Sequence, residues 1–311
     1  MIDNRVLVRV PASSANLGPG FDCLSLALGL HNLVALEILP DGVEVRVAGE
    51  GASEIPTGDD NLVLRAARRV FNRIRVHPTG LRLSLANAIP PARGLGSSAA
   101  AVVGGLVAAN ALTGNQLSRD ELLNLAAELE GHPDNVAPAL LGGLTVAVQD
   151  GPDVVWLRLD PPRGIIVLVA VPAFPLSTPR AREILPDQVA LQDAVFSLGR
   201  AALLVGAMST GRLDLLRTAM HDRLHQPFRE QLVPGLRDVF AAALDAGALG
   251  VALSGSGPAV VALCSRSEQV TPIAGRIRQA FQKHRLAVKM LSLAPDLHGA
   301  RVVDRDGGKV C

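Results

Sequence analysis

The stretch PPARGLGSSAAA at Pro90–Ala101 constrains the fold of this chain more than any other segment. It joins the strand-like alternation of Leu81–Ala88 to an Ala-rich, helix-like segment at Ser97–Leu112. Glycines let the backbone adopt positive φ and approach an anion closely, while free amides at a helix start carry the positive end of the helix dipole. The segment predicts a strand, a phosphate-binding turn and a helix in succession. Ser97 is the cap expected for this helix, and Asn61 and Ser118 are the caps expected for the helix-like segments on either side of it. From this motif alone, a purely structural turn with small residues for tight packing stays an alternative.

The distribution of lysine excludes two common ways of binding nucleotide phosphates. Only three of the 30 basic residues are lysines, namely Lys283, Lys289 and Lys309. A Walker A loop needs a lysine directly after its glycines, and a protein kinase needs one on an early strand. If the chain binds a nucleotide, backbone amides, a helix N-terminus, a metal ion and arginines must balance the phosphate charge.

Composition narrows the class of protein further. Of 311 residues, 49% are hydrophobic and 19% charged, a size and composition that predict two globular domains. We expect a cytoplasmic protein without a membrane partner, because no uninterrupted apolar run reaches about 18 residues and the first residues lack the layout of a signal peptide. A net charge of +1 and few aromatic residues argue against nucleic acid as a partner. Three scattered cysteines predict neither a disulfide framework nor a zinc site.

A cluster of small and polar residues, PASSANLGPGFD, follows the strand-like segment Arg5–Val10. We expect residues 11–22 to form a loop that can hold Asn16 and Asp22 close to a ligand. An Asx-rich turn that satisfies only its own backbone is an equally good interpretation of this cluster in isolation.

A second polar cluster, GHPDN at 131–135, follows a helix-like segment that contains Glu128 and Glu130. A carboxylate there can bind Mg²⁺, which prefers oxygen ligands and takes only one or two from protein in phosphoryl-transfer sites. A capped helix start with a solvated histidine is the alternative.

The second half of the chain offers arginines and another glycine-serine turn. The turn-forming sequence DPPRG at 160–164 predicts a boundary between domains 1–160 and 161–311. Arg182 and Arg229 each carry a planar guanidinium that can clamp a carboxylate with two hydrogen bonds. SGSGP at 254–258 links two apolar strands and can bring backbone close to a nucleotide, or simply make a tight turn.

In this order, PxxxGLGSSAA, an acidic helix ending in GHPDN and a late SGSGP turn resemble the three signature motifs of GHMP kinases. PASSANLGPGFD and GHPDNVAPALLGG are similar to the homoserine kinases within that superfamily. The resemblance implies an α+β fold with an N-terminal ATP-binding domain like domain 2 of ribosomal protein S5, a ferredoxin-like C-terminal domain and an active site between them. It also implies ATP-dependent phosphorylation of L-homoserine to O-phospho-L-homoserine in threonine biosynthesis and, by family habit, a homodimer.

The resemblance further implies roles for individual residues. Expected contacts to ATP come from Pro90, Pro91, Ala92, Arg93, Gly94, Leu95, Gly96, Ser97, Ser98, Ala99, Ala100, Asn61 and Thr178. Mg²⁺ is expected on Ser98 and on a helix glutamate, with Glu128 preferred over Glu130. The expected substrate contacts are Arg182 and Arg229 on the carboxylate, Asp134 on the ammonium, and Asn16, Asp22 and His132 around the hydroxyl.

Asn135 stands where mevalonate and galactose kinases place a catalytic aspartate. A carboxamide cannot take a proton at neutral pH. With Asn135, Asn16 and Asp22 as the catalytic residues, the resemblance implies catalysis by positioning and charge stabilisation, which the loose transition state of phosphoryl transfer permits. A GHMP kinase for another alcohol stays open as the alternative. A non-catalytic nucleotide or amino-acid sensor is disfavoured because the phosphate loop, the acidic helix and Asn135 are all present, and a serine hydrolase is disfavoured because the chain has no GxSxG elbow.

Overall fold

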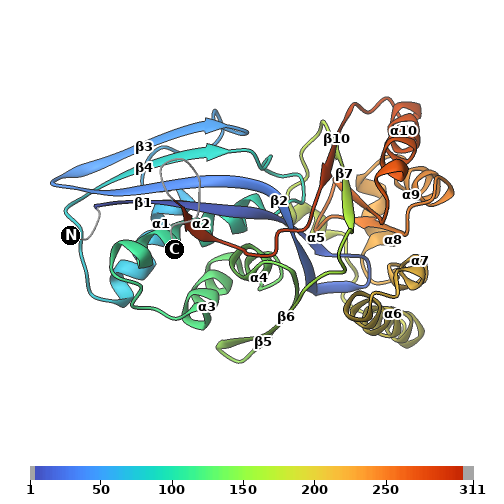
Figure 1. The fold of residues 1–311 in the computed structure, drawn as a ribbon, viewed down its shortest axis with the longest axis horizontal. Coiled ribbons are helices and arrows are strands. Elements are labelled where there is room, and N and C mark those ends of the chain that lie inside the picture. Colours follow the sequence, from blue (N-terminus) through green and yellow to red (C-terminus); the bar gives the residue numbers. More distant parts are fainter. Residues whose placement is uncertain (1–3, 304–311) are drawn as a thin grey trace.

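The computed structural model describes residues 4–303, which form two separate sheets with helices packed on them (Figure 1). The larger sheet contains β1 (Arg5–Asn16), β2 (Gly20–Leu39), β3 (Gly42–Gly49), β4 (Gly80–Asn87), β5 (Leu144–Asp150), β6 (Asp153–Leu159) and β11 (Arg301–Val303). The smaller sheet contains β7 (Ile166–Pro172), β8 (Gly250–Leu253), β9 (Val260–Cys264) and β10 (Val288–Leu293).

Strand β2 organises the larger sheet because it is long enough to pair with several partners. It runs antiparallel to β1, to β5 through Leu24–Leu26 and to β4 through Leu33–Leu39. β3 is parallel to β4, and the parallel pair is connected through helix α1 (Leu62–Arg73). The late strand β11 returns to pair with β1. The two sheets thus lie on either side of residue 160 except for β11, and the boundary at 160/161 stays a prediction.

Four helices, α1, α2 (Ser97–Leu112), α3 (Arg119–Glu130) and α4 (Val136–Leu141), cover one face of this sheet (Figure 1). α2 is the central helix, in contact with β1, β2 and the other three helices. It is apolar on all sides, as expected of a helix enclosed by protein. Gly104 packs against Val10 and Val34 of the sheet, so the small residues of this helix allow close approach of the two layers.

The second half of the chain folds around the smaller sheet. Its helices are α5 (Thr178–Glu183), α6 (Leu191–Thr210), α7 (Leu216–Ala219), α8 (Gln226–Arg229), α9 (Leu236–Asp245) and α10 (Ser267–Lys283), with 3₁₀ turns at Leu213–Leu215 and Glu230–Leu232. The strand order β10-β7-β9-β8 is antiparallel throughout, which is the order of a ferredoxin-like sheet. α9 and α10 cover one face of it and bury Val239, Ile277 and Phe281.

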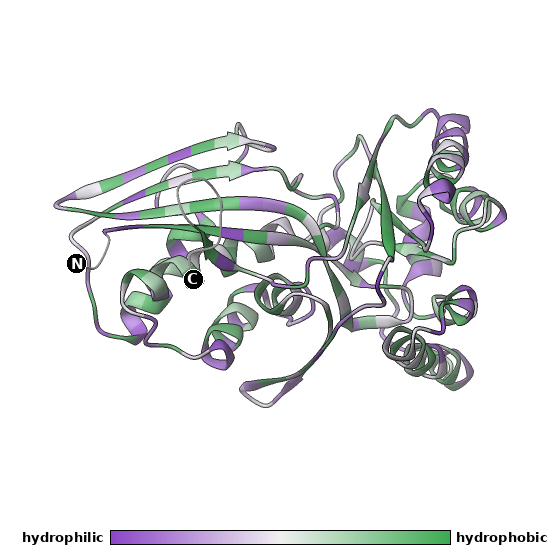
Figure 2. Cartoon of the chain, in the orientation of Figure 1, coloured by the Kyte–Doolittle hydropathy of each residue, from purple (hydrophilic) through white to green (hydrophobic). Residues whose placement is uncertain are grey.

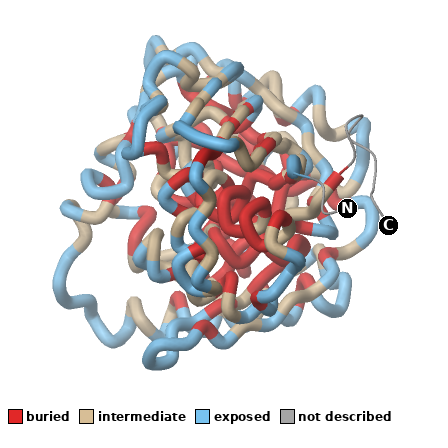
Figure 3. The backbone as a smooth tube through the Cα atoms, turned by 90° about the vertical axis from the view of Figure 1, so that its left-hand side faces the viewer, coloured by how far each residue is buried: buried red, intermediate tan, exposed pale blue. Residues whose placement is uncertain are grey.

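Hydropathy and burial follow the layers. The strands of the larger sheet alternate between apolar and polar residues (Figure 2), and the buried residues gather in the centre of the molecule (Figure 3). The predicted two-domain α+β fold is confirmed.

Within residues 4–303, one helix, α6, has the length and apolar composition that a membrane span would need, and one such helix is weak evidence of a span. Asp193 and Arg200 lie within this helix, so its sequence is not an uninterrupted run of apolar residues.

Three local predictions were wrong. Residues 11–22 do not form a loop, because β1 continues to Asn16 and a short turn leads into β2, which makes a hairpin. Ser97 is the first residue of α2 and not its cap, since Gly96 occupies the cap position. The long helix α10 was not predicted at all. The predicted caps Asn61 and Ser118 are confirmed.

Candidate active site

A cavity of about 760 Å³ is lined by residues from both halves of the chain. Its walls come from the β1–β2 hairpin, the loop before α1, the segment between β4 and α2, the α3–α4 connection, the start of α5 and the turn between β8 and β9. All the motifs singled out in the sequence therefore meet at one place.

The segment between β4 and α2 is shaped by two glycines. Gly94 has φ of 75° and Gly96 has φ of 68°, a region that side chains rarely adopt. A Cβ on Gly94 would collide with the carbonyl oxygen of Ser254, and one on Gly96 would collide with Oγ of Ser13. Glycine is needed at both positions because the hairpin and the β8–β9 turn press against this loop.

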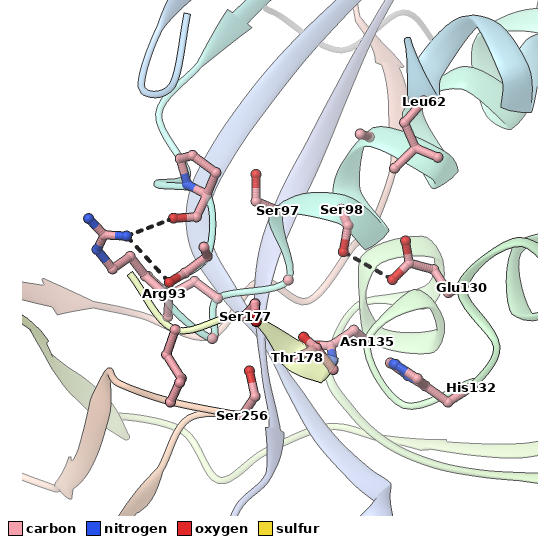
Figure 4. Close-up of a pocket in the computed structure, with 18 of the residues that line it drawn as sticks. Leu62, Arg93, Ser97, Ser98, Glu130, His132, Asn135, Ser177, Thr178 and Ser256 are labelled. Carbon is pink, nitrogen blue, oxygen red and sulfur yellow. Dashed lines mark hydrogen bonds between the residues drawn. The ribbon is translucent and has the colours of Figure 1, made fainter. Parts of the chain in front are cut away.

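The N-terminus of α2 opens into the cavity (Figure 4). The amide of Ala100 is the first to bond to a backbone carbonyl, that of Gly96, so the amides at Ser97–Ala99 have no intrahelical partner. Ser97 and Ser98 both line the cavity, and Oγ of Ser98 donates to Oε2 of Glu130 at 3.0 Å. Free amides, two hydroxyls and a helix dipole together suit an anion.

Most of the residues expected to bind ATP line this cavity. These are Pro91, Ala92, Arg93, Gly94, Leu95, Gly96, Ser97, Ser98, Asn61 and Thr178. Pro90 instead lines a second hollow behind the loop, and Ala99 and Ala100 are fully buried in the body of α2. The side chain of Asn61 caps α1, because its Oδ1 accepts from the amides of Val63 and Leu64.

Several lining residues were missed in the sequence. Ile55, Pro56 and Leu62 give the cavity an apolar wall beside Asn61, whose Nδ2 donates to the carbonyl of Pro56, and Ser177 lines the cavity next to Thr178. Ser256 also lines the cavity, and it belongs to the SGSGP turn already singled out in the sequence. The sequence carried no signal for the apolar wall, because it depends on how the loop before α1 folds over the sheet.

The two glutamates of α3 lie in different surroundings, and Glu128, the one preferred from the sequence, lies outside the cavity lining. Glu128 is exposed and pairs with Arg69 at 2.6 Å, outside the cavity lining. Glu130 lines the cavity beside Ser98 (Figure 4). Burial raises the pKa of Glu130, and the hydrogen bond from Ser98 offsets part of this rise. Residues two apart, such as Glu128 and Glu130, lie on opposite sides of a helix. Glu130 lies one turn after the buried Ala126 and Ala127 and therefore on the same side as they do. This periodicity could have identified Glu130 as the glutamate that faces the protein.

His132, Asp134 and Asn135 form one hydrogen-bonded cluster at the start of α4. Oδ1 of Asp134 lies 2.5 Å from Nδ1 of His132, 2.7 Å from the amide of Asn135 and 3.2 Å from Nδ2 of Asn135. The hydrogen bond to Asp134 raises the pKa of His132 against the opposing effect of burial. Oδ1 of Asn135 accepts from Oγ of Ser13 at 2.8 Å. Oδ2 of Asp134 accepts no hydrogen bond from any residue in 4–303 and is the oxygen left for a ligand.

Asn16 and Asp22 lie on either side of the hairpin turn and both have positive φ, 71° and 57°. Oδ1 of Asn16 accepts from the amide of Asp22 at 3.0 Å, and its Nδ2 donates to the carbonyl of Gly255 at 2.9 Å. Asp22 accepts two hydrogen bonds of 2.9 Å from Arg182, which makes a bidentate pair across the two halves of the chain. The structure therefore joins Asp22 and Arg182 directly.

Arg229 is almost completely buried, at 2% relative exposure, and still lines the cavity. Its Nε donates to the carbonyl of Ala181 at 3.1 Å, and its Nη1 donates to the carbonyl of Gly255 at 3.1 Å. Burial lowers the pKa of Arg229 to about 10, so the guanidinium stays charged at neutral pH. A buried positive charge that reaches a cavity is a candidate partner for an anionic group of a ligand.

Both halves of the chain match models of one kinase class. The model "GHMP kinases N terminal domain" matches residues 61–143, and "GHMP kinases C terminal" matches residues 200–283. The first match spans the α2 loop and the His132 cluster. Mevalonate kinase of L. major has the same fold, with a TM-score of 0.69 and 21% identity.

Closer relatives are homoserine kinases. That of Moorella thermoacetica is 50% identical over 298 residues, which is 96% of this chain and 99% of that protein. That of Carboxydothermus hydrogenoformans is 47% identical over 95% of this chain and 96% of that protein. The crystal structure of homoserine kinase from Cytophaga hutchinsonii superposes with a TM-score of 0.90 at 31% identity and covers 97% of this chain and 98% of that one. The chain belongs to the homoserine kinase family of GHMP kinases, which are ATP-dependent enzymes.

Proposed function

We propose that this enzyme transfers the γ-phosphoryl group of ATP to the side-chain hydroxyl of L-homoserine, giving O-phospho-L-homoserine, a step of threonine biosynthesis. The observation that carries the proposal is that one cavity combines an anion-binding helix start with a cluster of fixed positive and negative side chains. The first suits a nucleotide phosphate, and the second suits a zwitterionic amino alcohol. The homoserine kinases that this chain is similar to support the same choice. The cytoplasmic location and the homodimer stay predictions.

The phosphates of ATP would lie against the glycine-serine loop and the free amides of Ser97–Ala99. The apolar wall formed by Ile55, Pro56 and Leu62 would receive the adenine. No lysine contributes to the cavity lining within residues 4–303, so the helix dipole and the backbone amides carry most of the phosphate recognition.

Ser98 and Glu130 are the residues we propose to hold Mg²⁺. A hydroxyl and one carboxylate, next to the place proposed for the phosphates, match the sparse oxygen ligands that Mg²⁺ takes from protein in such sites. When bound, the ion would neutralise charge on the phosphate oxygens. We do not assign this role to Glu128, because it lies outside the cavity lining and pairs with Arg69.

For the amino acid, we propose that Arg229 and Arg182 bind the carboxylate. Nη2 of Arg229 donates no hydrogen bond to any residue that the structure describes, and it is therefore the nitrogen available to a ligand. A zwitterion has no net charge, so binding it beside the Arg182–Asp22 ion pair leaves the net charge of the site unchanged. Oδ2 of Asp134 is proposed to receive the ammonium.

Asn16, Asp22 and His132 would surround the hydroxyl, and Asn135 would orient the reacting groups. Both polar atoms of the Asn135 side chain are engaged, one with Ser13 and one with Asp134. Catalysis would therefore rest on alignment of the hydroxyl with the γ-phosphoryl group and on charge neutralisation, without a strong enzymic base.

The direct test is ADP release with Mg-ATP and a panel of alcohols, namely L-homoserine, L-serine, L-threonine, mevalonate and galactose, with the product identified by mass. We expect a strong preference for L-homoserine and formation of phosphohomoserine. Activity confined to another alcohol would overturn the substrate assignment, and ligand binding without any ADP release would favour a sensor.

A further inference from the structure

His225 is a buried histidine beside the site, and none of the roles above uses it. It directly precedes α8 and has no exposed surface. Its Nε2 lies 2.7 Å from the carbonyl oxygen of Gly18, and its Nδ1 lies 3.0 Å from Nη1 of Arg229. Because a carbonyl oxygen can only accept a hydrogen bond, Nε2 carries the proton and Nδ1 presents its lone pair to Arg229.

The surroundings of His225 hold it in this state. Burial lowers the pKa of the imidazole, so the ring is neutral near pH 7. Asp222 accepts from the amides of Leu224, His225 and Gln226 and from Oγ of Ser197, which fixes the segment before α8. Oδ2 of Asp222 also lies 3.5 Å from Nε2 of His225, and this favours the same tautomer.

Phe21, in the β1–β2 hairpin, completes the arrangement. Its ring stacks on His225 with centroids 5.0 Å apart and planes at 25°. The guanidinium carbons of Arg229 and Arg182 lie 5.3 Å and 5.7 Å from the same ring centroid. One aromatic side chain from the first half of the chain therefore contacts the histidine and both arginines of the proposed carboxylate clamp.

We propose that His225 is a positioning residue for the substrate carboxylate, because its Nδ1 and the carbonyls of Ala181 and Gly255 hold Arg229 so that only Nη2 is left for the ligand. Three acceptors from three segments restrict both the position and the rotation of the guanidinium. A guanidinium that is already fixed loses less conformational freedom when it binds a carboxylate. The inference rests on the proposed carboxylate role of Arg229.

Replacing His225 by Asn or by Gln tests its two hydrogen bonds one at a time, because each amide side chain reproduces the position of one ring nitrogen. His225→Asn keeps an acceptor near the position of Nδ1 and loses the contact to Gly18, whereas His225→Gln keeps a donor near the position of Nε2 and loses the acceptor for Arg229. We expect His225→Gln to raise the KM for L-homoserine by about 10-fold or more, as for one lost hydrogen bond to a charged group, and His225→Asn to raise it much less. The KM for ATP should be unchanged in both. His77→Asn, at an exposed histidine that does not line the cavity, is the control.

Two further measurements separate positioning from a general structural effect. In an Arg229→Ala background, His225→Gln should have no further effect on the KM for L-homoserine, because the two side chains act through one contact. The acceptor 3-aminopropan-1-ol lacks the carboxylate, so its kcat/KM should be the same in wild type and His225→Gln.

Each contrary result has its own meaning. Equal KM values for L-homoserine in wild type and His225→Gln would overturn the positioning role and leave the proposed reaction intact. So would an equal rise in this KM in His225→Gln and His225→Asn, if the effect of His225→Gln also added to that of Arg229→Ala. An unchanged KM for L-homoserine in Arg229→Ala would overturn the carboxylate role of Arg229 and the positioning role with it. A wild-type enzyme that phosphorylates neither L-homoserine nor 3-aminopropan-1-ol would overturn the substrate assignment as well.

Discussion

Replacing Glu130 by Gln should reduce activity strongly without weakening the fold. The amide has nearly the same shape as the carboxylate and can still accept the hydrogen bond from Ser98. Burial raises the pKa of Glu130, which means that folding disfavours its charged form, so a neutral residue should leave the melting temperature unchanged or raise it. A carboxyl group kept at a buried position that disfavours its charged form points to a functional role for Glu130.

The loss of activity follows from the proposed metal contact. A metal ion contributes several kcal/mol of charge stabilisation, and we expect removal of its carboxylate ligand to cost roughly 2–4 kcal/mol, or about 30- to 1000-fold in kcat. The assay is ADP release as a function of Mg²⁺ concentration, in which Glu130→Gln should also need more Mg²⁺ for half-maximal rate. The raised pKa of the Glu130 carboxyl has a further consequence. Because the protonated carboxyl cannot bind a metal, the affinity of the wild-type enzyme for Mg²⁺ should fall on acidification.

Glu128→Gln is the matched control on the same helix. Both side chains of its ion pair with Arg69 are exposed, so removing this pair should change the free energy of unfolding by about 0.5 kcal/mol or less. The Mg²⁺ dependence of the rate should be unaltered. If Glu128→Gln lost as much activity as Glu130→Gln, or if Glu130→Gln behaved like wild type at limiting Mg²⁺, the assignment of the metal to Glu130 would be wrong.

Other perturbations test the remaining assignments. Ser98→Ala should lower kcat about 10-fold with every acceptor alcohol, measured by ADP release. Arg182→Ala and Arg229→Ala should each raise the KM for L-homoserine about 10-fold or more and leave that for ATP unchanged; no change in either would remove the clamp. Burial alone would raise the pKa of Asp296, but hydrogen bonds lower it to about 2. Asp296→Asn should therefore cost about 2–3 kcal/mol in urea unfolding at neutral pH, and this cost should vanish as pH falls from about 4 to about 2.

The elements with strong local signals could be predicted from the sequence. The span Ser97–Leu112 matches α2, and the caps at Asn61 and Ser118 match the starts of α1 and α3, because cap chemistry and small-residue patterning act over a few neighbouring residues. The segment between β4 and α2 was identified as an anion site because its glycines and serines are also neighbours in sequence. Residue type and local spacing were enough to find it.

The parts that could not be predicted depend on contacts between distant segments. Residues 10–16 lack the alternation of a half-buried strand because they are buried on both faces, so their small side chains resembled a loop. The Asp22–Arg182 pair joins residues 160 apart in sequence, and His225 meets Gly18 across 207 residues. Neither contact leaves a local pattern, because each arises only when the hairpin inserts into the second half of the chain.

The same insertion would allow the proposed mechanism, which uses no strong enzymic base, to align two substrates. The amide of Gly255 donates to Ala15 at 3.0 Å, and Oγ of Ser254 bonds to Oγ of Ser14 at 2.9 Å and to the carbonyl of Gly94 at 2.6 Å. The hairpin, the phosphate loop and the β8–β9 turn are thus one hydrogen-bonded unit. The groups proposed to hold ATP are thereby tied to those proposed to hold the acceptor. For a reaction whose barrier is lowered mainly by alignment, this fixed relation between the two half-sites can take the place of a strong enzymic base, with the hydroxyl proton passing to an oxygen of the transferred phosphate.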